Sequence, residues 1–341
     1  MIHVLRILSW CVGAAQRVDI VVTWINYTTG YVEDPTTPDV YGPPIHYKPY
    51  NQVGLKRAPW TEVCWTVRSY MYWDMDHLIN KIYIVYNERR HPPPDCFDLR
   101  YRSTVVFISY SVLLQGTILD HPDASAPRPS AVRVFMHRIP KLLPYFIWTM
   151  DDIFLTRKFR ISDFYDDAQQ KIKTRMTGGV RNFNPWQYES NMALTNWLGQ
   201  PSVHSEGLHV PSLIERQKSQ ELEDHFSNTL YSKCYSPIHI CEFHVHYITL
   251  VLNYMILRGV AINHPPPFNL FSEVHTTESM DLRQRLSRPS TWMNVQGVGV
   301  SDEYQFRNVK DAVRLRIEFD EWLSAQPFFN YSPARKQKYD F

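Results

Sequence analysis

The chain is poor in cysteine and has almost no net charge. Its five cysteines include no CxxC pair, which argues against a disulfide-dense scaffold and against a cysteine-ligated zinc site, although one or two disulfides stay open. Lys and Arg total 36 against 34 Asp and Glu, a net charge of +2. This near balance gives no electrostatic reason to expect a nucleic acid or an acidic membrane surface as a partner.

A long hydrophobic segment is also missing from the start of the chain. Residues 1–15 are mildly apolar, but they carry His3 and Arg6 and are too short to span a bilayer. They fit a weak signal sequence or a first strand, and we favour the strand. The stretches Asn26-Tyr-Thr28 and Asn330-Tyr-Ser332 match the N-glycosylation acceptor pattern, which matters only in a secretory lumen.

What the chain does contain is enough apolar sequence for a large core. Of its 341 residues, 44% are hydrophobic, so the chain could hold one large or two ordinary domains with a substantial core. Apolar runs predict buried strands, and apolar residues at helical spacing predict helices between them. Strands that alternate with helices indicate an α/β fold, a doubly wound, mostly parallel sheet with helices on both faces and loop-rich insertions. The expected strands are 19–25, 81–86, 104–110 and 145–150, and the expected helices include 59–77 and 130–139.

The stretch from Ser130 to Leu155 combines a short helix with a strand that ends in two acids. Ser130 is a suitable N-cap, Pro140 stops the helix, and Arg133 and His137 would share one helical flank. Asp151 and Asp152 then stand at the carboxyl end of the strand, where ligands gather in open α/β sheets. Adjacent carboxylates there can hold a divalent cation or act as a base. The simpler alternative is an Asp-Asp turn that caps the next element.

The second half of the chain has a weaker pattern. Residues 175–207 show no clean period and predict extended excursions and loops. A long amphipathic helix is expected to begin at Pro211, with Leu222, Phe226 and Leu230 on one face. His209 would then lie beside the helix N-terminus, where backbone N–H groups can bind phosphate. The alternative is a histidine that only stabilises the loop. Residues 293–304 predict a strand and turn, and residues 303–326 a closing helix.

Four regions occur in a characteristic order: residues 18–30, 58–165, 205–260 and, more loosely, 290–330. They contain Asp19-Ile-Val-Val-Thr-Trp-Ile-Asn26, then Val67-Arg68-Ser69 with His137-Arg-Ile139 and Phe146-Ile-Trp-Thr-Met-Asp-Asp152, then His209-Val-Pro211. This order resembles the Stealth family. Its members include bacterial capsule hexose-1-phosphate transferases and the lysosomal-enzyme N-acetylglucosamine-1-phosphotransferase.

The resemblance implies a single catalytic domain over residues 1–341 that acts as a phosphotransferase. It would move a sugar 1-phosphate from a nucleotide sugar, such as UDP-N-acetylglucosamine, to a hydroxyl of a glycan or glycoprotein acceptor, with UMP leaving and Mg²⁺ or Mn²⁺ assisting. Asp152 matches the family's catalytic aspartate, as base or metal partner, and His209 its catalytic histidine. Asp151 and Asp152 would hold the metal. The expected substrate-binding residues are Trp24, Asn26, Arg68, Asn87, His137 and Arg138.

Two expected catalytic positions differ from the family pattern. Arg133 stands where the family has a glutamate, and His239 falls at or near an expected arginine. These exchanges motivate an alternative, a catalytically silent protein that binds a nucleotide sugar or glycan. A second alternative is a metal-dependent glycosyltransferase that passes the sugar alone. Whether a second subunit contributes, for instance in a homodimer, is left open. The compartment is open too, since bacterial relatives suggest the cytoplasm and animal relatives the Golgi lumen.

Overall fold

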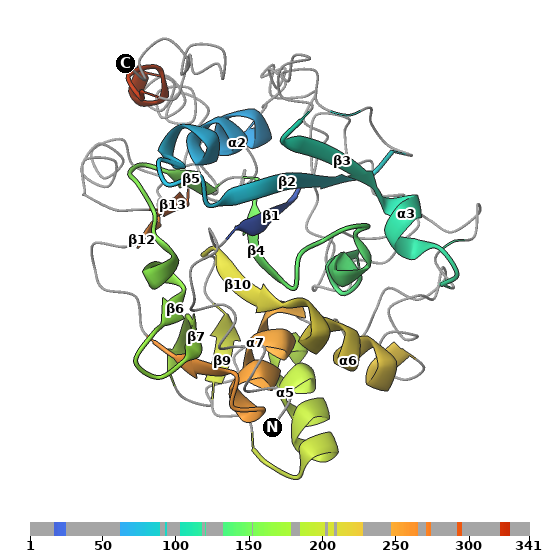
Figure 1. Ribbon diagram of the computed structural model, residues 1–341. Coiled ribbons are helices and arrows are strands. Elements are labelled where there is room, and N and C mark those ends of the chain that lie inside the picture. The colour runs from blue at the N-terminus through green and yellow to red at the C-terminus, as the bar shows by residue number, and fades with distance from the viewer. Residues whose placement is uncertain are drawn as a thin grey trace, which may run out of the picture.

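A five-stranded sheet forms the centre of the computed structural model, in the order β10-β4-β1-β2-β3 (Figure 1). β1 (Val18–Thr23), β2 (Ile79–Tyr86), β3 (Val105–Ser109) and β4 (Tyr145–Met150) are parallel, whereas β10 (Ser212–Glu215) runs antiparallel to β4. The mostly parallel α/β sheet predicted from the sequence is therefore confirmed. The structure describes residues 17–24, 62–88, 93, 103–117, 120, 132–151, 153–178, 185–201, 204–207, 210–227, 247–264, 271–273, 292–294 and 321–327.

The sheet is covered on both faces, as a doubly wound fold requires. Every residue of β1 is buried, which explains why this strand is an unbroken run of apolar and small residues apart from Asp19. On β4, successive side chains point to opposite faces. Thr149 accepts a hydrogen bond from Tyr70 of helix α2 (Glu62–Trp73), whereas the ring of Trp148 lies 5.2 Å from the Arg133 guanidinium carbon. The helix α2 and the segment around Arg133 thus cover opposite faces.

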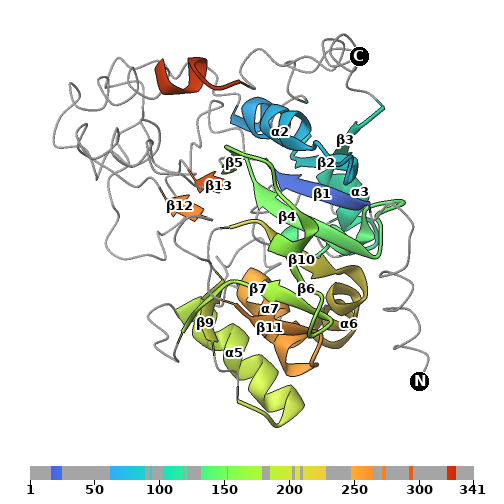
Figure 2. The ribbon, with the colours of Figure 1, turned by 60° about the vertical axis from the view of Figure 1, so that its left-hand side comes forward.

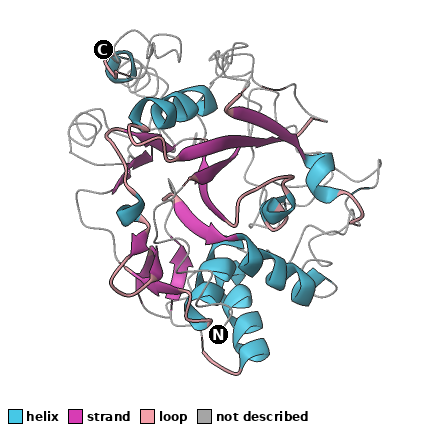
Figure 3. Cartoon of the chain, in the orientation of Figure 1, coloured by secondary structure: helices cyan, strands magenta, loops and turns pink. Residues whose placement is uncertain are grey.

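Smaller sheets and helices flank the central sheet (Figures 2 and 3). The helices are α3 (Tyr110–Leu114), α5 (Pro185–Leu198), α6 (Arg216–Phe226) and α7 (Tyr247–Leu257), with 3₁₀ helices η5 (Met136–Arg138) and η6 (Ile161–Asp163). The other strands are β5 (Ile153–Leu155), β6 (Tyr165–Asp166), β7 (Lys171–Thr174), β8 (Met176–Gly178), β9 (His204–Gly207), β11 (Ala261–Asn263), β12 (Phe271–Glu273) and β13 (Trp292–Asn294). They form the sheets β11-β7-β6, β12-β13-β5 and β8-β9.

A buried carboxylate fixes the amino-terminal end of the sheet. Asp19 accepts hydrogen bonds from the side chain of Asn80 at 2.8 Å and from the backbone N–H groups of Lys81 and Leu143 at 3.1 and 2.7 Å. Burial raises the pKa of Asp19 above its ordinary value, although these hydrogen bonds act in the opposite direction. The carboxylate ties β1, β2 and the loop before β4 together, so this acid has a structural role at the edge opposite the strand ends.

The helix expected over residues 130–139 is confirmed only at Val132 and Arg133 and is wrong for the described residues after them. Within the described residues, the backbone N–H groups of Phe135, Arg138 and Ile139 donate to the carbonyls three residues earlier, the pattern of 3₁₀ turns. After the helical residues Val132 and Arg133, the described chain turns at residues 134–135 and continues as η5. Arg133 and His137 therefore do not share a flank of one α-helix, and they contact different parts of the protein, Trp148 and Glu223.

The helix expected to begin at Pro211 actually begins at Arg216. The four residues before it form β10, which pairs with the edge of β4 that faces away from β1. Pairing with a sheet edge overrides the local helical signal, because it satisfies a row of backbone groups that would otherwise be unpaired. The prediction that His209 lies beside a helix N-terminus loses its basis, since a strand separates residue 209 from α6. Leu222 and Phe226 are buried, as the apolar face predicted.

The prediction of extended excursions and loops over residues 175–207 is wrong for the helix α5, whereas β8 and β9 in the same region are extended. The helix α5 escaped the sequence pattern because its buried side includes Ser190 and Asn191. Asn191 accepts a hydrogen bond from Asn253 of α7 at 3.0 Å, so polar residues make this helix contact. A search for apolar residues at helical spacing does not detect such a face.

Several predictions fall wholly or partly outside the described residues. They include the first strand over residues 1–15 and most of the closing helix, of which residues 321–324 are helical. Cys64 is buried in α2 and disulfide-bonded, and the other cysteines all lie outside the described residues. At least one disulfide therefore forms. Among the described helices, none has the length and apolar character needed to cross a membrane.

Candidate active site at the carboxyl ends of the strands

Three of the predicted site residues follow strand ends at the same edge of the central sheet. Thr23 at the end of β1 is in register with Val85 of β2 and Met150 of β4. The next residues along these strands, Trp24, Tyr86 and Asp151, therefore lie at the same level, and Asn87 stands one residue further along the chain from β2. Trp24, Asn87 and Asp151 follow the three strand ends and are all buried, with 4%, 5% and 7% of their surface exposed. The sheet thus brings an indole, an amide and a carboxylate to the edge where open α/β sheets bind ligands.

The carboxylate of Asp151 suits a hard divalent cation. Among the described residues, no group of three or more His, Cys, Asp and Glu side chains could enclose a metal ion. Mg²⁺ and Mn²⁺ do not need such a cage, since one or two carboxylates commonly share them with substrate phosphates. The residues present therefore fit a cation held jointly with a phosphate ligand. Asp152, the second expected metal ligand, lies outside the described residues.

Arg133 lies against β4, on the face opposite α2. Its guanidinium carbon is 5.2 Å from the centre of the Trp148 ring, a cation–π geometry. Trp148 precedes Asp151 by three positions. Arg133 therefore places a permanent positive charge on the face of β4 opposite α2, near the carboxyl end of this strand. An arginine side chain stays protonated at all physiological pH values, so Arg133 cannot act as the base. What it can supply is a positive field for an anion.

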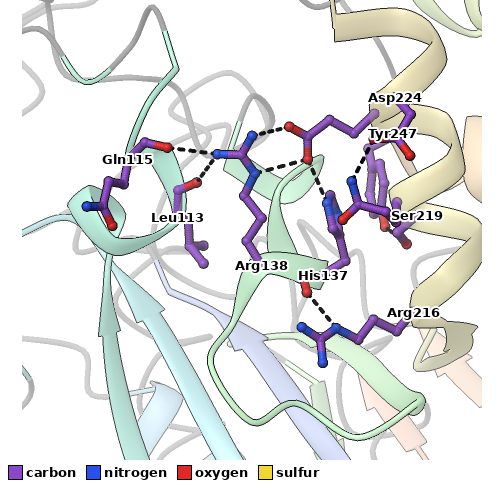
Figure 4. Close-up of polar contacts among 10 residues, drawn as sticks. Leu113, Gln115, His137, Arg138, Arg216, Ser219, Asp224 and Tyr247 are labelled. Carbon is purple, nitrogen blue, oxygen red and sulfur yellow. Dashed lines mark hydrogen bonds and ion pairs between the residues drawn. The ribbon is translucent and has the colours of Figure 1, made fainter.

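His137 and Arg138 are joined to Glu223 of α6 (Figure 4). His137 Nε2 lies 2.6 Å from Glu223 Oε2, and Arg138 donates to both carboxylate oxygens and to the carbonyls of Leu113 and Gln115. The structure thus places these two expected substrate-binding residues in a network that joins η5, α3 and α6. Burial raises the pKa of Glu223, but the hydrogen bonds from His137 and Arg138 outweigh it and hold this pKa below its ordinary value.

Sequence reasoning missed Glu223, although a signal existed. Lys218, Ser219, Leu222, Glu223 and Phe226 are the buried residues of α6, so Glu223 is an acid on the side of the helix that Leu222 and Phe226 turn towards the core. A charged residue at such a position needs a partner, because an isolated buried charge is costly. The remaining predicted residues stay untested. Arg68 is partly buried on α2, and Asn26, Asp152, His209 and His239 lie outside the described residues.

The fold and the site define a class: an α/β protein with a mostly parallel sheet whose carboxyl edge carries Trp24, Asn87 and Asp151. No protein-family model and no curated protein matches the chain, so the Stealth resemblance stays a prediction.

Solved structures similar to this chain include three glycosyltransferases. The galactosyltransferase LgtC, in complex with donor and acceptor sugar analogues, has 11% identity and a TM-score of 0.44, covering 94% of this chain and 99% of that chain. Mouse xyloside xylosyltransferase 1 has 12% identity and a TM-score of 0.36, covering 82% and 97%. The bifunctional glycosyltransferase WbbM has 8% identity and a TM-score of 0.45, covering 95% and 51%. TM-scores at this level carry no argument about function.

Proposed function

We propose that this protein transfers a sugar 1-phosphate from a UDP-sugar to a glycan hydroxyl and releases UMP. The observation that carries the proposal is that Trp24, Asn87 and Asp151 are buried and follow the carboxyl ends of three neighbouring parallel strands, β1, β2 and β4. An indole can pack against a base or sugar, an amide can bind hydroxyls, and a carboxylate can hold a cation beside a diphosphate. The ordered sequence regions that resemble the Stealth family supply the reaction type.

The reaction assigns distinct tasks to residues at this edge. The acceptor oxygen forms a bond to the phosphorus nearest the sugar, the bond from that phosphorus to the oxygen of the departing UMP breaks, and the hydroxyl proton moves to a base. Asp152 is the residue we assign as base or metal ligand, and His209 as donor to the phosphate. A divalent cation bound at Asp151 and Asp152 would neutralise charge on the diphosphate. Arg133 would add positive potential from the face of β4 opposite α2.

Arg133 also favours a second function, binding of the nucleotide sugar without turnover. The family's acid at this position is replaced by a side chain that cannot accept a proton, and its guanidinium packs against Trp148. If that acid were essential for transfer, the protein would retain a diphosphate-binding edge but no chemistry.

The released nucleotide separates these functions. The protein is incubated with UDP-N-acetylglucosamine, Mg²⁺ or Mn²⁺ and a panel of glycan acceptors, and the nucleotides are resolved by ion-exchange chromatography. We expect acceptor-dependent UMP and a phosphodiester on the acceptor. UDP would instead indicate transfer of the sugar alone. Calorimetric binding of the donor with neither nucleotide released would favour the binding protein.

A further inference from the structure

Helix α2 holds the chain on both sides of the acid pair. The Thr66 hydroxyl donates to the main-chain carbonyl of Asp151 at 2.6 Å. The Tyr70 hydroxyl donates to Thr149 Oγ1 at 3.2 Å, before the acids, and Ser69 Oγ accepts from the Leu155 N–H at 2.9 Å, after them. The helix therefore contacts the segment from β4 to β5 at three points, one of them at Asp151 itself.

These contacts come from one buried face of α2. Thr66, Ser69 and Tyr70 are at helical spacing i, i+3 and i+4, and no more than 1% of each residue is exposed. Val63 and Val67 of the same helix belong to the hydrophobic core, so apolar side chains alone could pack this helix. A buried hydroxyl is costly unless it is hydrogen-bonded. Thr66 and Ser69 meet that requirement through hydrogen bonds to the main chain of Asp151 and Leu155. Ser69 also donates to the Thr66 carbonyl at 2.7 Å.

We propose that Thr66 is a positioning residue for Asp151, and through it for the divalent cation assigned to this edge. The Asp151 carbonyl carbon is bonded to the Asp151 Cα, so fixing this oxygen restrains the main chain from which the Asp151 carboxylate extends. Groups that orient metal ligands typically change metal affinity by about ten- to a hundredfold when they are removed. The proposal rests on the proposed function, because that function assigns the cation.

The test is the affinity of the purified protein for Mn²⁺ at a saturating concentration of UDP, whose diphosphate completes the cation's ligands, measured by electron paramagnetic resonance. Thr66→Val keeps the branched shape and removes the hydroxyl, and we expect it to weaken Mn²⁺ binding at least about tenfold. Thr66→Ser restores a hydroxyl and should bind Mn²⁺ within about twofold of the wild type. Tyr70→Phe is the matched control, since it removes a hydroxyl from the same helix face but not the bond to the Asp151 carbonyl. Its melting temperature should fall while its Mn²⁺ affinity stays near that of the wild type.

Three results would overturn the positioning role. They are a folded Thr66→Val variant with wild-type Mn²⁺ affinity, an equal loss of affinity in Tyr70→Phe, and a wild-type protein that binds no Mn²⁺. Failure of the proposed function gives a different result. If the wild type binds Mn²⁺ but releases no UMP, the phosphotransferase proposal fails while the affinities of the variants still decide the role of Thr66.

Discussion

Asp152→Asn is expected to lower the rate of sugar-phosphate transfer by about a thousandfold, in the middle of the range for loss of a general base. An asparagine amide has nearly the same shape as the carboxylate, but it cannot accept the acceptor's proton and brings no negative charge to a cation. The measurement is kcat for UMP release at saturating UDP-N-acetylglucosamine, together with a melting curve that shows the variant is folded.

Asp167→Asn provides the control for this loss. Asp167 is an exposed aspartate in the turn between β6 and β7. The same change of acid to amide there should leave kcat within about twofold of the wild type, since exposed sites of this kind tolerate substitution. An Asp152→Asn variant that turns over as fast as the wild type would remove Asp152 from the chemistry.

Glu223→Ala is expected to produce the largest loss of stability, roughly 3–5 kcal/mol in the free energy of unfolding. The carboxylate is 7% exposed and serves both His137, which is 1% exposed, and Arg138, which is 30% exposed. Its removal leaves His137 and Arg138 without their carboxylate partner. Breaking a buried ion pair in this way destabilises a protein by more than the intact pair stabilises it. The measurement is urea denaturation of the wild type and the variant at neutral pH.

The neighbouring acid supplies a matched control. Asp224 is exposed on the same helix and accepts a hydrogen bond from Gln220, so Asp224→Ala should change the free energy of unfolding by less than about 0.5 kcal/mol. Equal effects of the two substitutions would show that the Glu223 network does not stabilise the fold.

The contribution of Glu223 should also depend on pH. Its pKa in the folded protein lies below the ordinary value of 4.5, so the folded state holds the proton less tightly than the unfolded chain does. The stability due to this shift is fully present above pH 4.5 and is lost as the pH falls through the folded-state pKa. The difference in unfolding free energy between wild type and Glu223→Ala should therefore shrink in acid. A difference that grows below pH 4.5 would contradict this sign.

The central sheet could be predicted from the sequence because its strands are buried on both faces. Such strands are continuous apolar runs, and β4 occupies the expected residues 145–150. The short strand β10 could not be predicted, because four residues from Ser212 become a strand only through pairing with β4. The helix α5 was missed because Asn191 and Asn253 pair across a buried contact, which a search for apolar residues at helical spacing does not detect.

The candidate site shows the same division. That Trp24, Asn87 and Asp151 share an edge follows from where the predicted strands end, since parallel strands finish at one side of a sheet. The role of Glu223 could not be derived in that way, because its partners His137 and Arg138 lie more than eighty residues away in the sequence. The direction of the Thr66 hydroxyl likewise depends on how α2 packs on β4.

The most direct measurement for the proposed function is an experimental structure of the protein with a UDP-sugar and Mn²⁺ bound. The account predicts that the diphosphate lies at the edge formed by Trp24, Asn87 and Asp151, with Asp152 on the metal and the His209 imidazole within hydrogen-bonding reach of a phosphate oxygen, about 2.6–3.2 Å. A structure in which the nucleotide binds elsewhere, or in which solid protein separates His209 from Asp152, would contradict it.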